Sequence, residues 1–411
     1  MRALVFWGSL STFVVACSAG GGVNLASLPT EGAHDAAPFD EEAADASSAR
    51  KPDGGRKTDA GKTTEVAAGA AFASDPKNCG AVGHDCRGAM CTAGLCEPEK
   101  VATVHRPIAL AVAGAQLFMV DYPKSSSTPE LFRSGKIPGS SATSVPGPKL
   151  YGHFDTLELS VGGDYIYFAL LGAGDGALHR RPIGGVDAGS DERISSDVPY
   201  EDVKSFNANA THVAFAVANY PSGTWLRTHS GTLVEFPSLT TDPVRRRLDF
   251  LSFEGDAVFG LYDGKIYETK LAAPTTANLV FATGAGGFDS AFVATSVAFY
   301  GVTFRYSNPV TCASTNFNLW RKPRPGASAS TGGILLAGHG WVPSLRADGK
   351  GAVYPLRPCG NGDTPLMAYR ETDGAAYALA EFDGATDVFA LDDEYVYFSR
   401  WDDDALYRVA R

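Results

Sequence analysis

Acidic residues recur at one position of a repeating pattern in this chain, close to the start of an apolar run in five of seven repeats. They are Asp155, Asp202, Asp249, Asp289 and Asp387. Carboxylate oxygens gathered at one place suit a hard cation such as calcium, which takes about six to eight oxygen ligands. The alternative is that these acids are ordinary solvated groups at turns and strand starts.

Two histidines occupy similar positions in two of the repeats. They are His153 and His339, and each follows a glycine. A histidine beside a carboxylate can act as a general base, whereas an exposed loop histidine does no chemistry. Together with the five acids they form a candidate site, which we place at the mouth of a central channel. The chain lacks the Gly-x-Ser-x-Gly, His-Glu-x-x-His, EF-hand and phosphate-loop motifs, so no catalytic residue is assigned.

A three-residue signature defines the repeats that must position this site. It consists of an apolar residue, a second large residue and an arginine. The copies are Leu131-Phe132-Arg133, Leu178-His179-Arg180, Trp225-Leu226-Arg227, Leu319-Trp320-Arg321, Ala368-Tyr369-Arg370 and Leu406-Tyr407-Arg408, with Ile266-Tyr267-Glu268 as an acidic variant. Successive copies lie 38 to 53 residues apart. Such a period, built from strands, is typical of a β-propeller.

Each repeat also carries an alternating apolar run, a tight turn and a second apolar strand before its signature. In the last repeat these are Val388–Leu391, Asp392–Glu394 and Tyr395–Phe398. Period-two alternation between Gly, Asp and Pro turns predicts strands and hairpins. The alternative, two packed β-sandwiches, would show strands without one shared period.

The last repeat ends on its third strand, at Arg411. The β-prone segment Lys100–His105 precedes the first repeat, and we expect it to supply the missing outer strand and close the ring. The prediction is an all-β fold, a seven-bladed β-propeller of four-stranded antiparallel blades over residues 99–411. The repeated arginines are expected to pack each blade on the next and to pair with an acid there.

With these repeats the chain resembles bacterial β-propellers with degenerate repeats, a group that includes TolB-like and lipoprotein-receptor-like propellers. The resemblance covers about three quarters of the chain. It implies the fold, but propellers serve both as enzymes and as binding scaffolds. Lactonase-like propellers hold calcium near the channel mouth, so calcium is the one cofactor the resemblance suggests, and otherwise none is expected.

The N-terminus reads as an export signal over residues 1–16: Met1-Arg2, an apolar run and then Cys17. Val14-Val15-Ala16-Cys17 matches the bacterial lipobox, which implies that Cys17 is lipidated and that Ser18 directs the protein to the outer membrane or cell surface. The alternative is an ordinary signal with an incidental cysteine. Residues 17–76 are rich in Ala, Gly, Ser, Thr and Asp, and are expected to form a disordered tether.

Four cysteines fall within residues 77–98, at Cys79, Cys86, Cys91 and Cys96. In an exported chain they predict two disulfides, with three pairings open. The alternative is zinc held by four thiolates or with His84, although zinc sites usually show closer cysteine pairs. The segment resembles small Gly-Cys modules of myxobacterial surface proteins. We expect a rigid knot that the propeller does not need for its fold.

Two further cysteines, Cys312 and Cys359, fall between the second and third strands of neighbouring repeats. Loops of this kind emerge on one face of a propeller, so the two cysteines are predicted to form a disulfide. The alternative is two unpaired buried cysteines. That face is the expected binding surface.

The net charge is −11, from 35 Lys and Arg against 46 Asp and Glu, which disfavours nucleic acid as a partner. No second apolar span of membrane length follows the signal. The sequence therefore predicts a non-catalytic cell-envelope lipoprotein whose propeller binds or scaffolds protein or glycan. The alternative is a calcium-dependent hydrolase or lactonase-like enzyme with its site at the channel mouth.

Overall fold

The computed structural model describes residues 72–124, 128–146, 156–171, 176–184, 191–198, 203–218, 222–237, 239, 248–282, 291–306, 315–324, 333–339, 342–357, 364–382, 388–400 and 403–411. These residues form thirty strands. No helix among them is long and apolar enough to cross a membrane.

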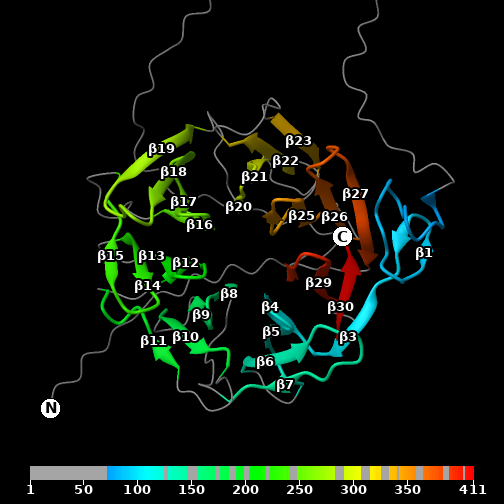
Figure 1. The fold of residues 1–411 in the computed structure, drawn as a ribbon, viewed down its shortest axis with the longest axis horizontal. Coiled ribbons are helices and arrows are strands. Elements are labelled where there is room, and N and C mark those ends of the chain that lie inside the picture. The colour runs from blue at the N-terminus through cyan, green and yellow to red at the C-terminus, as the bar shows by residue number, and fades with distance from the viewer. Residues whose placement is uncertain are drawn as a thin grey trace, which may run out of the picture. The chain divides into compact units, whose positions relative to one another are not determined.

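Seven four-stranded antiparallel sheets form a ring (Figure 1). The strands of each blade are given from inner to outer. Blade 1 consists of β4 (Pro107–Ala113), β5 (Gln116–Asp121), β6 (Glu130–Gly135) and β7 (Thr143–Ser144). Blade 2 consists of β8 (Thr156–Gly162), β9 (Tyr165–Leu171), β10 (Leu178–Pro182) and β11 (Glu192–Arg193), and blade 3 of β12 (Val203–Ala208), β13 (His212–Val217), β14 (Gly223–Thr228) and β15 (Leu233–Glu235).

Blades 4 to 7 complete the ring. Blade 4 consists of β16 (Asp249–Glu254), β17 (Ala257–Tyr262), β18 (Lys265–Lys270) and β19 (Ala277–Ala282), and blade 5 of β20 (Ala291–Ala294), β21 (Ala298–Tyr306), β22 (Thr315–Pro323) and β23 (Gly333–His339). Blade 6 consists of β24 (Arg346–Asp348), β25 (Gly351–Pro355), β26 (Thr364–Arg370) and β27 (Ala376–Phe382). Blade 7 consists of β28 (Phe389–Leu391), β29 (Tyr395–Arg400), β30 (Ala405–Ala410) and β3 (Glu99–Thr103). The seven-bladed prediction is confirmed.

Alternation along each strand buries its two faces against different blades. In β4, Ala109 and Ala111 share a core with Ile166 of blade 2. The intervening Leu110 shares a core with Leu406 of blade 7. Because successive side chains of a strand point to opposite faces, one blade cannot bury its apolar residues alone. The blades must therefore stack around a ring.

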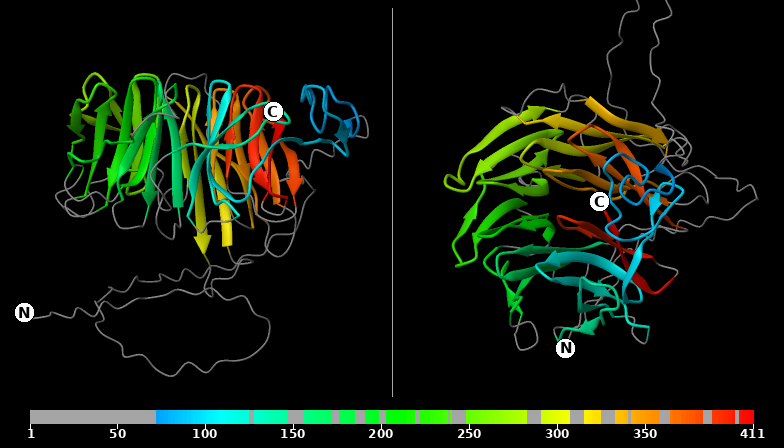
Figure 2. Two further views of the ribbon diagram at one scale, coloured as in Figure 1. Left: turned by 90° about the horizontal axis from the view of Figure 1, so that it is seen from below. Right: turned by 45° about the vertical axis from the view of Figure 1, so that its right-hand side comes forward.

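The ring is closed by a strand from far along the chain, as predicted. Strand β3 pairs with β30, with Glu99 opposite Arg408 and Thr103 opposite Ala405. Blade 7 thus combines the first propeller strand with the last three. Closure leaves each blade with a neighbour on both faces, and the strands run between the two faces of the ring (Figure 2).

The cysteine-rich knot contains β1 (Cys91–Thr92) and β2 (Leu95–Cys96). Its disulfides join Cys79 to Cys91 and Cys86 to Cys96. The described part starts at Phe72, whose carbonyl oxygen accepts a hydrogen bond from the Gly80 N–H at 3.1 Å, so the knot reaches further back than residue 77.

The knot is not a separate module. All four of its cysteines are buried in one cluster with residues of blades 6 and 7, among them Leu379 and Phe389. The reason is physical: so short a segment cannot bury enough apolar area by itself, and it completes the core between two blades.

Candidate functional site: the loop face

The two faces of the ring differ in their connections. On one, which we call the turn face, the first and second strands of every blade are joined by only two or three residues. On the other, the loop face, eight residues separate Tyr306 from Thr315, and thirteen separate Glu235 from Asp249. The turn face also has connections of nine residues, such as that from Pro182 to Glu192, but these join the two outer strands of a blade. Beside the channel the loop face therefore has the longer segments, which are the usual carriers of binding residues.

Two of the seven predicted channel-mouth residues fall in the described part of the chain. Asp249 begins β16, an inner strand. His339 instead ends β23, the outer strand of blade 5, opposite Asn316, and the next inner strand begins only at Arg346. The outer strand is longer than its sequence suggested, and this moves His339 away from an inner-strand start. Outside the described residues lie His153, Asp155, Asp202, Asp289 and Asp387, and also Cys17, Cys312 and Cys359.

Inner strands on the loop face begin irregularly. The pairing register of β16 shifts between Asp249 and Ser252, and Phe250 takes a φ of 51°. Similar shifts occur near the starts of β4 and β12. Bulges at such rims re-aim side chains and are common beside functional sites. The inner strands are therefore irregular where they begin on the loop face, whereas they end in tight turns on the turn face.

A polar cluster on this face was not predicted from the sequence. His105 lies in the connection from β3 to β4, and its Nδ1 is 2.7 Å from Oδ1 of Asp404 in blade 7. The ammonium group of Lys124 pairs with Oδ2 of the same carboxylate. Both contacts lower the pKa of Asp404, that of Lys124 more strongly. We call His105, Asp121, Lys124 and Asp404 the loop-face cluster.

Asp121, at the end of β5, fixes the position of His105. Its carboxylate is 3% exposed and accepts the backbone N–H of His105 at 2.9 Å and that of Arg106 at 2.5 Å. Burial raises the pKa of Asp121, and the backbone donors oppose this shift. The available sequence signal was a histidine just before the first inner strand, together with the acidic run Asp402–Asp404.

The loop-face cluster contains a histidine–carboxylate pair, His105 and Asp404. A carboxylate on one nitrogen of a half-exposed imidazole orients the ring, as in general bases and in histidine metal ligands. The pair also bridges the point where the ring closes, between blades 1 and 7. Its placement therefore serves closure whether or not a ligand binds.

Within the described residues, one group of three side chains has metal-ligand geometry: Cys79, Cys86 and Cys96. Their sulfurs are all in disulfides, so none is a thiolate that could hold zinc. Calcium at the predicted acids stays a prediction, because four of those five residues lie outside the described part of the chain.

The repeated arginines lie toward the turn face and join neighbouring blades. Arg321 of blade 5 pairs with Glu371 of blade 6 at 2.6 Å. Arg180 of blade 2 donates to the carbonyl oxygen of His229 in blade 3 at 2.8 Å, and Arg408 of blade 7 to that of Lys136 in blade 1 at 3.2 Å. These three arginines contact the next blade, as predicted, but only Arg321 pairs with an acid there. The acid partners of Arg180 and Arg408 are Glu192 and Glu99, each in the arginine's own blade.

Other copies vary the pattern. Arg227 turns back to the carbonyl oxygen of Ile194 in blade 2, at 2.5 Å. Arg370 pairs with Asp373 of its own blade. The acidic variant Glu268 approaches Arg324 of blade 5 at 3.9 Å. In the ion pair between blades 4 and 5 the acid therefore belongs to the earlier blade and the arginine to the later one. The repeats are therefore degenerate in partner as well as in sequence.

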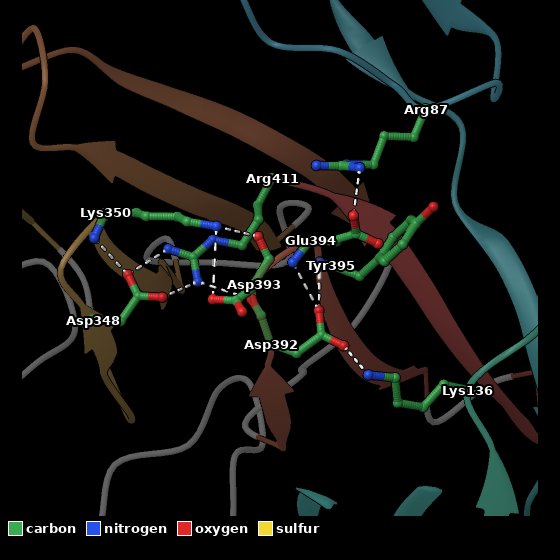
Figure 3. A network of polar contacts seen from close by, with 9 residues as sticks. All are labelled: Arg87, Lys136, Asp348, Lys350, Asp392, Asp393, Glu394, Tyr395 and Arg411. Carbon is green, nitrogen blue, oxygen red and sulfur yellow. Dashed lines mark hydrogen bonds and ion pairs between the residues drawn. The ribbon is translucent and has the colours of Figure 1, made fainter. Parts of the chain in front are cut away.

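A network on the turn face is self-neutralising (Figure 3). Arg411 pairs with Asp348 at 2.7 Å, Lys136 with Asp392, and Arg87 of the knot with Glu394 at 2.9 Å. Lys350 donates to the carbonyl oxygen of Asp393 at 2.6 Å. The nine residues drawn include four acids and four bases, so their side-chain charges balance. We assign this network to structure and not to binding.

No protein-family model matches the chain, and no curated protein matches it. Similar solved structures are β-propeller proteins. Virginiamycin B lyase from Staphylococcus aureus is 11% identical, with 77% of this chain and 98% of that chain covered and a TM-score of 0.49. The WD40 β-propeller domain of Doa1 is 12% identical (77% and 97% covered, TM-score 0.46), and PorZ of Porphyromonas gingivalis 9% identical (73% and 36% covered, TM-score 0.45). At these values the likeness concerns the fold alone.

Proposed function

We propose that this chain is a non-catalytic, lipid-anchored protein of the outer membrane or cell surface. Its propeller binds or scaffolds a protein or glycan partner through the loop face. The observation that carries the proposal is the difference between the faces: tight first turns and a neutralised network on one, long connections and bulged strand starts on the other.

The described part of the loop face offers polar groups that a partner could meet. The side chain of Lys124 is 70% exposed and that of His105 is 39% exposed. Asp404 pairs with both side chains, and Asp121 also holds the backbone of His105. Groups that are already ordered lose little entropy on binding.

The test compares the faces with a photo-crosslinking amino acid at single positions. Lys124 reports on the loop face, and Lys350, 57% exposed, is the matched lysine on the turn face. In living cells we expect crosslinked protein or glycan at position 124 and little at 350. Adducts at 350 alone, or equally at both, would contradict the proposal.

The second candidate is a calcium-dependent hydrolase or lactonase-like enzyme. One described observation favours it: Asp249 does begin an inner strand, next to a bulge. Calcium content of the purified protein tests this idea, with Asp249→Ala against Asp256→Ala, an exposed acid on the turn face. Stoichiometric calcium lost only in the first variant would favour the enzyme.

A further inference from the structure

The first strand of the propeller and the last strand meet in blade 7. The closing strand β3 starts at Glu99, three residues after Cys96 of the knot, and it pairs with β30, the last strand. Whatever holds the knot in place therefore also holds the start of the closing strand. At its other end the same strand leads to His105, which Asp404 and Asp121 hold.

The knot packs on both blades that flank the seam between blades 6 and 7. Its four cysteines share a core with Leu379 of β27 and Val409 of β30. Between them lies His84, which is 1% exposed. Its Nδ1 is 2.6 Å from the carbonyl oxygen of Cys79, and its Nε2 is 3.1 Å from that of Ala410. One imidazole thus joins the knot to the last strand.

The same ring also contacts blade 6, where it lies 4.8 Å from the ring of Tyr377 in β27. On the turn face, Arg87 of the knot pairs with Glu394, next to the Asp392–Lys136 pair that reaches blade 1 (Figure 3). The knot and its network therefore span the seams on both sides of blade 7.

The packing of the knot on blades 6 and 7 depends on the two disulfides. Strands β1 and β2 pair at only two positions, and a hairpin so small is not stable alone in water. The two disulfides link residues 12 and 10 positions apart and cross-link the whole segment. Without them, only a few backbone hydrogen bonds, such as that from the Cys86 N–H to the carbonyl oxygen of Pro76 at 2.7 Å, would hold the cysteines and His84 against β27 and β30.

We propose that the knot is a redox-dependent clasp: blade 7 closes stably only after both disulfides have formed. The folding of the ring is thereby coupled to an oxidising compartment, independently of what the loop face binds. The expectation that the propeller does not need the knot is replaced by this inference.

The oxidant class is the disulfide of a thiol–disulfide oxidoreductase. For each bond, one cysteine thiolate attacks the carrier disulfide and displaces one carrier thiolate, which gives a mixed disulfide. The second cysteine thiolate then displaces the other carrier sulfur. The knot dithiol loses two electrons and two protons, and the carrier becomes a dithiol.

Hydrogen exchange of the whole mature chain tests the clasp. In the double variant Cys86→Ser, Cys96→Ser, we expect exchange in β3 and β30 to accelerate at least about tenfold while β13 of blade 3 stays protected. The melting temperature should fall by about 5 °C. Met90→Ser, at a knot residue that is 63% exposed, is the control and should change neither.

A second variant keeps the proposal testable if the cysteine variant does not fold. His84→Ala leaves both disulfides intact but removes the contact with Ala410, and it should expose the same two strands. Unchanged protection of β3 and β30 in either folded variant, or an equal loss in every blade, would overturn the clasp.

Discussion

Arg321 in blade 5 donates to both carboxylate oxygens of Glu371 in blade 6, at 2.6 Å each. The hydroxyl of Tyr300 donates to the same carboxylate. Strand pairing explains the geometry, because Tyr300 lies directly opposite Arg321 in the sheet. A tyrosine opposite the signature arginine recurs in blades 2 and 7, as Tyr167 and Tyr397.

The three tyrosines differ in their acceptors. Tyr397 donates to Asp392 at 3.1 Å. In blade 2, Gly162 occupies the position equivalent to Asp392, since each lies three positions before the first tyrosine of its second strand, Tyr165 or Tyr395. A Cβ at Gly162 would meet the carbonyl oxygen of Asn209 at 2.4 Å. Blade 2 therefore has no room for this acid. Burial raises the pKa of Tyr167 to about 12, although Arg180 works in the opposite direction.

Arg321→Lys should destabilise the ring by about 2 kcal/mol, because an ammonium group cannot replace the two-pronged hydrogen bonding of a guanidinium to a largely buried carboxylate. The matched control is Arg370→Lys, whose acid partner Asp373 is 45% exposed, with an expected cost below about 1 kcal/mol. Urea unfolding measures both. Equal costs would show that the pair between blades has no special weight.

Asp392 should make stability depend on acidity. Burial works to raise its pKa, but Lys136 and the backbone N–H groups of Glu394 and Tyr395 outweigh this and lower it. A carboxyl group with a lowered folded-state pKa stabilises the fold above its unfolded value, near 4, and this stabilisation is lost as pH falls through the folded pKa. Asp392→Asn should reduce stability at pH 7 and flatten its decline below pH 4. A parallel pH profile would contradict the assignment.

Much of the fold could be predicted because its signal is periodic. The spacing of the signatures gave seven blades, and the missing outer strand after Arg408 pointed to the segment that became β3. Both follow from one rule, that every blade needs four strands and two neighbours. The contact of Arg180, Arg321 and Arg408 with the next blade followed from the same repetition, whereas the expected acid partner in that blade is present for Arg321 alone among these three.

The loop-face cluster and the docking of the knot could not be predicted in this way. His105 and Asp404 are 299 positions apart, and His84 and Ala410 are 326 apart. Periodicity shows that a strand exists and which side chains share a face, but it does not show what covers the outer edge of a blade. Those contacts arise only once ring closure brings the ends of the chain together.

The proposed lipid anchor depends on one residue, Cys17. Cys17→Ser should move the protein from the membrane fraction to the soluble fraction in detergent partitioning, because the acyl chains would be lost. Mass spectrometry of the wild-type N-terminus should find the acyl mass on Cys17. Ser18→Ala keeps the cysteine and serves as the control. An unmodified terminus elsewhere in the first thirty residues would refute the anchor.

Cys312 and Cys359 are predicted to be joined by a disulfide. They come from neighbouring blades, between β21 and β22 and between β25 and β26. Non-reducing peptide mapping of freshly exported protein should yield one cross-linked peptide pair, besides the two pairs from the knot. Alkylatable thiols at both positions would end this prediction and leave the knot disulfides unaffected.

Asp121 offers the sharpest test of the loop-face cluster, because it positions His105 without touching its ring. Asp121→Asn would place an amide group where two backbone N–H groups now find carboxylate oxygens. Leaving one buried donor without an acceptor costs about 1–3 kcal/mol. We expect a loss of that size at pH 7, together with faster exchange of the His105 and Arg106 amides. Asp403→Asn, at a half-buried acid in the neighbouring turn, is the control and should leave those amides protected.

Since burial raises the pKa of Asp121, its carboxyl group favours the folded state more in acid than at neutral pH. The wild type should therefore gain stability relative to the variant as pH falls from 7 to 4. If the two amides exchange equally in both variants, Asp121 does not hold His105 in place, and the loop-face cluster is not organised by this carboxylate.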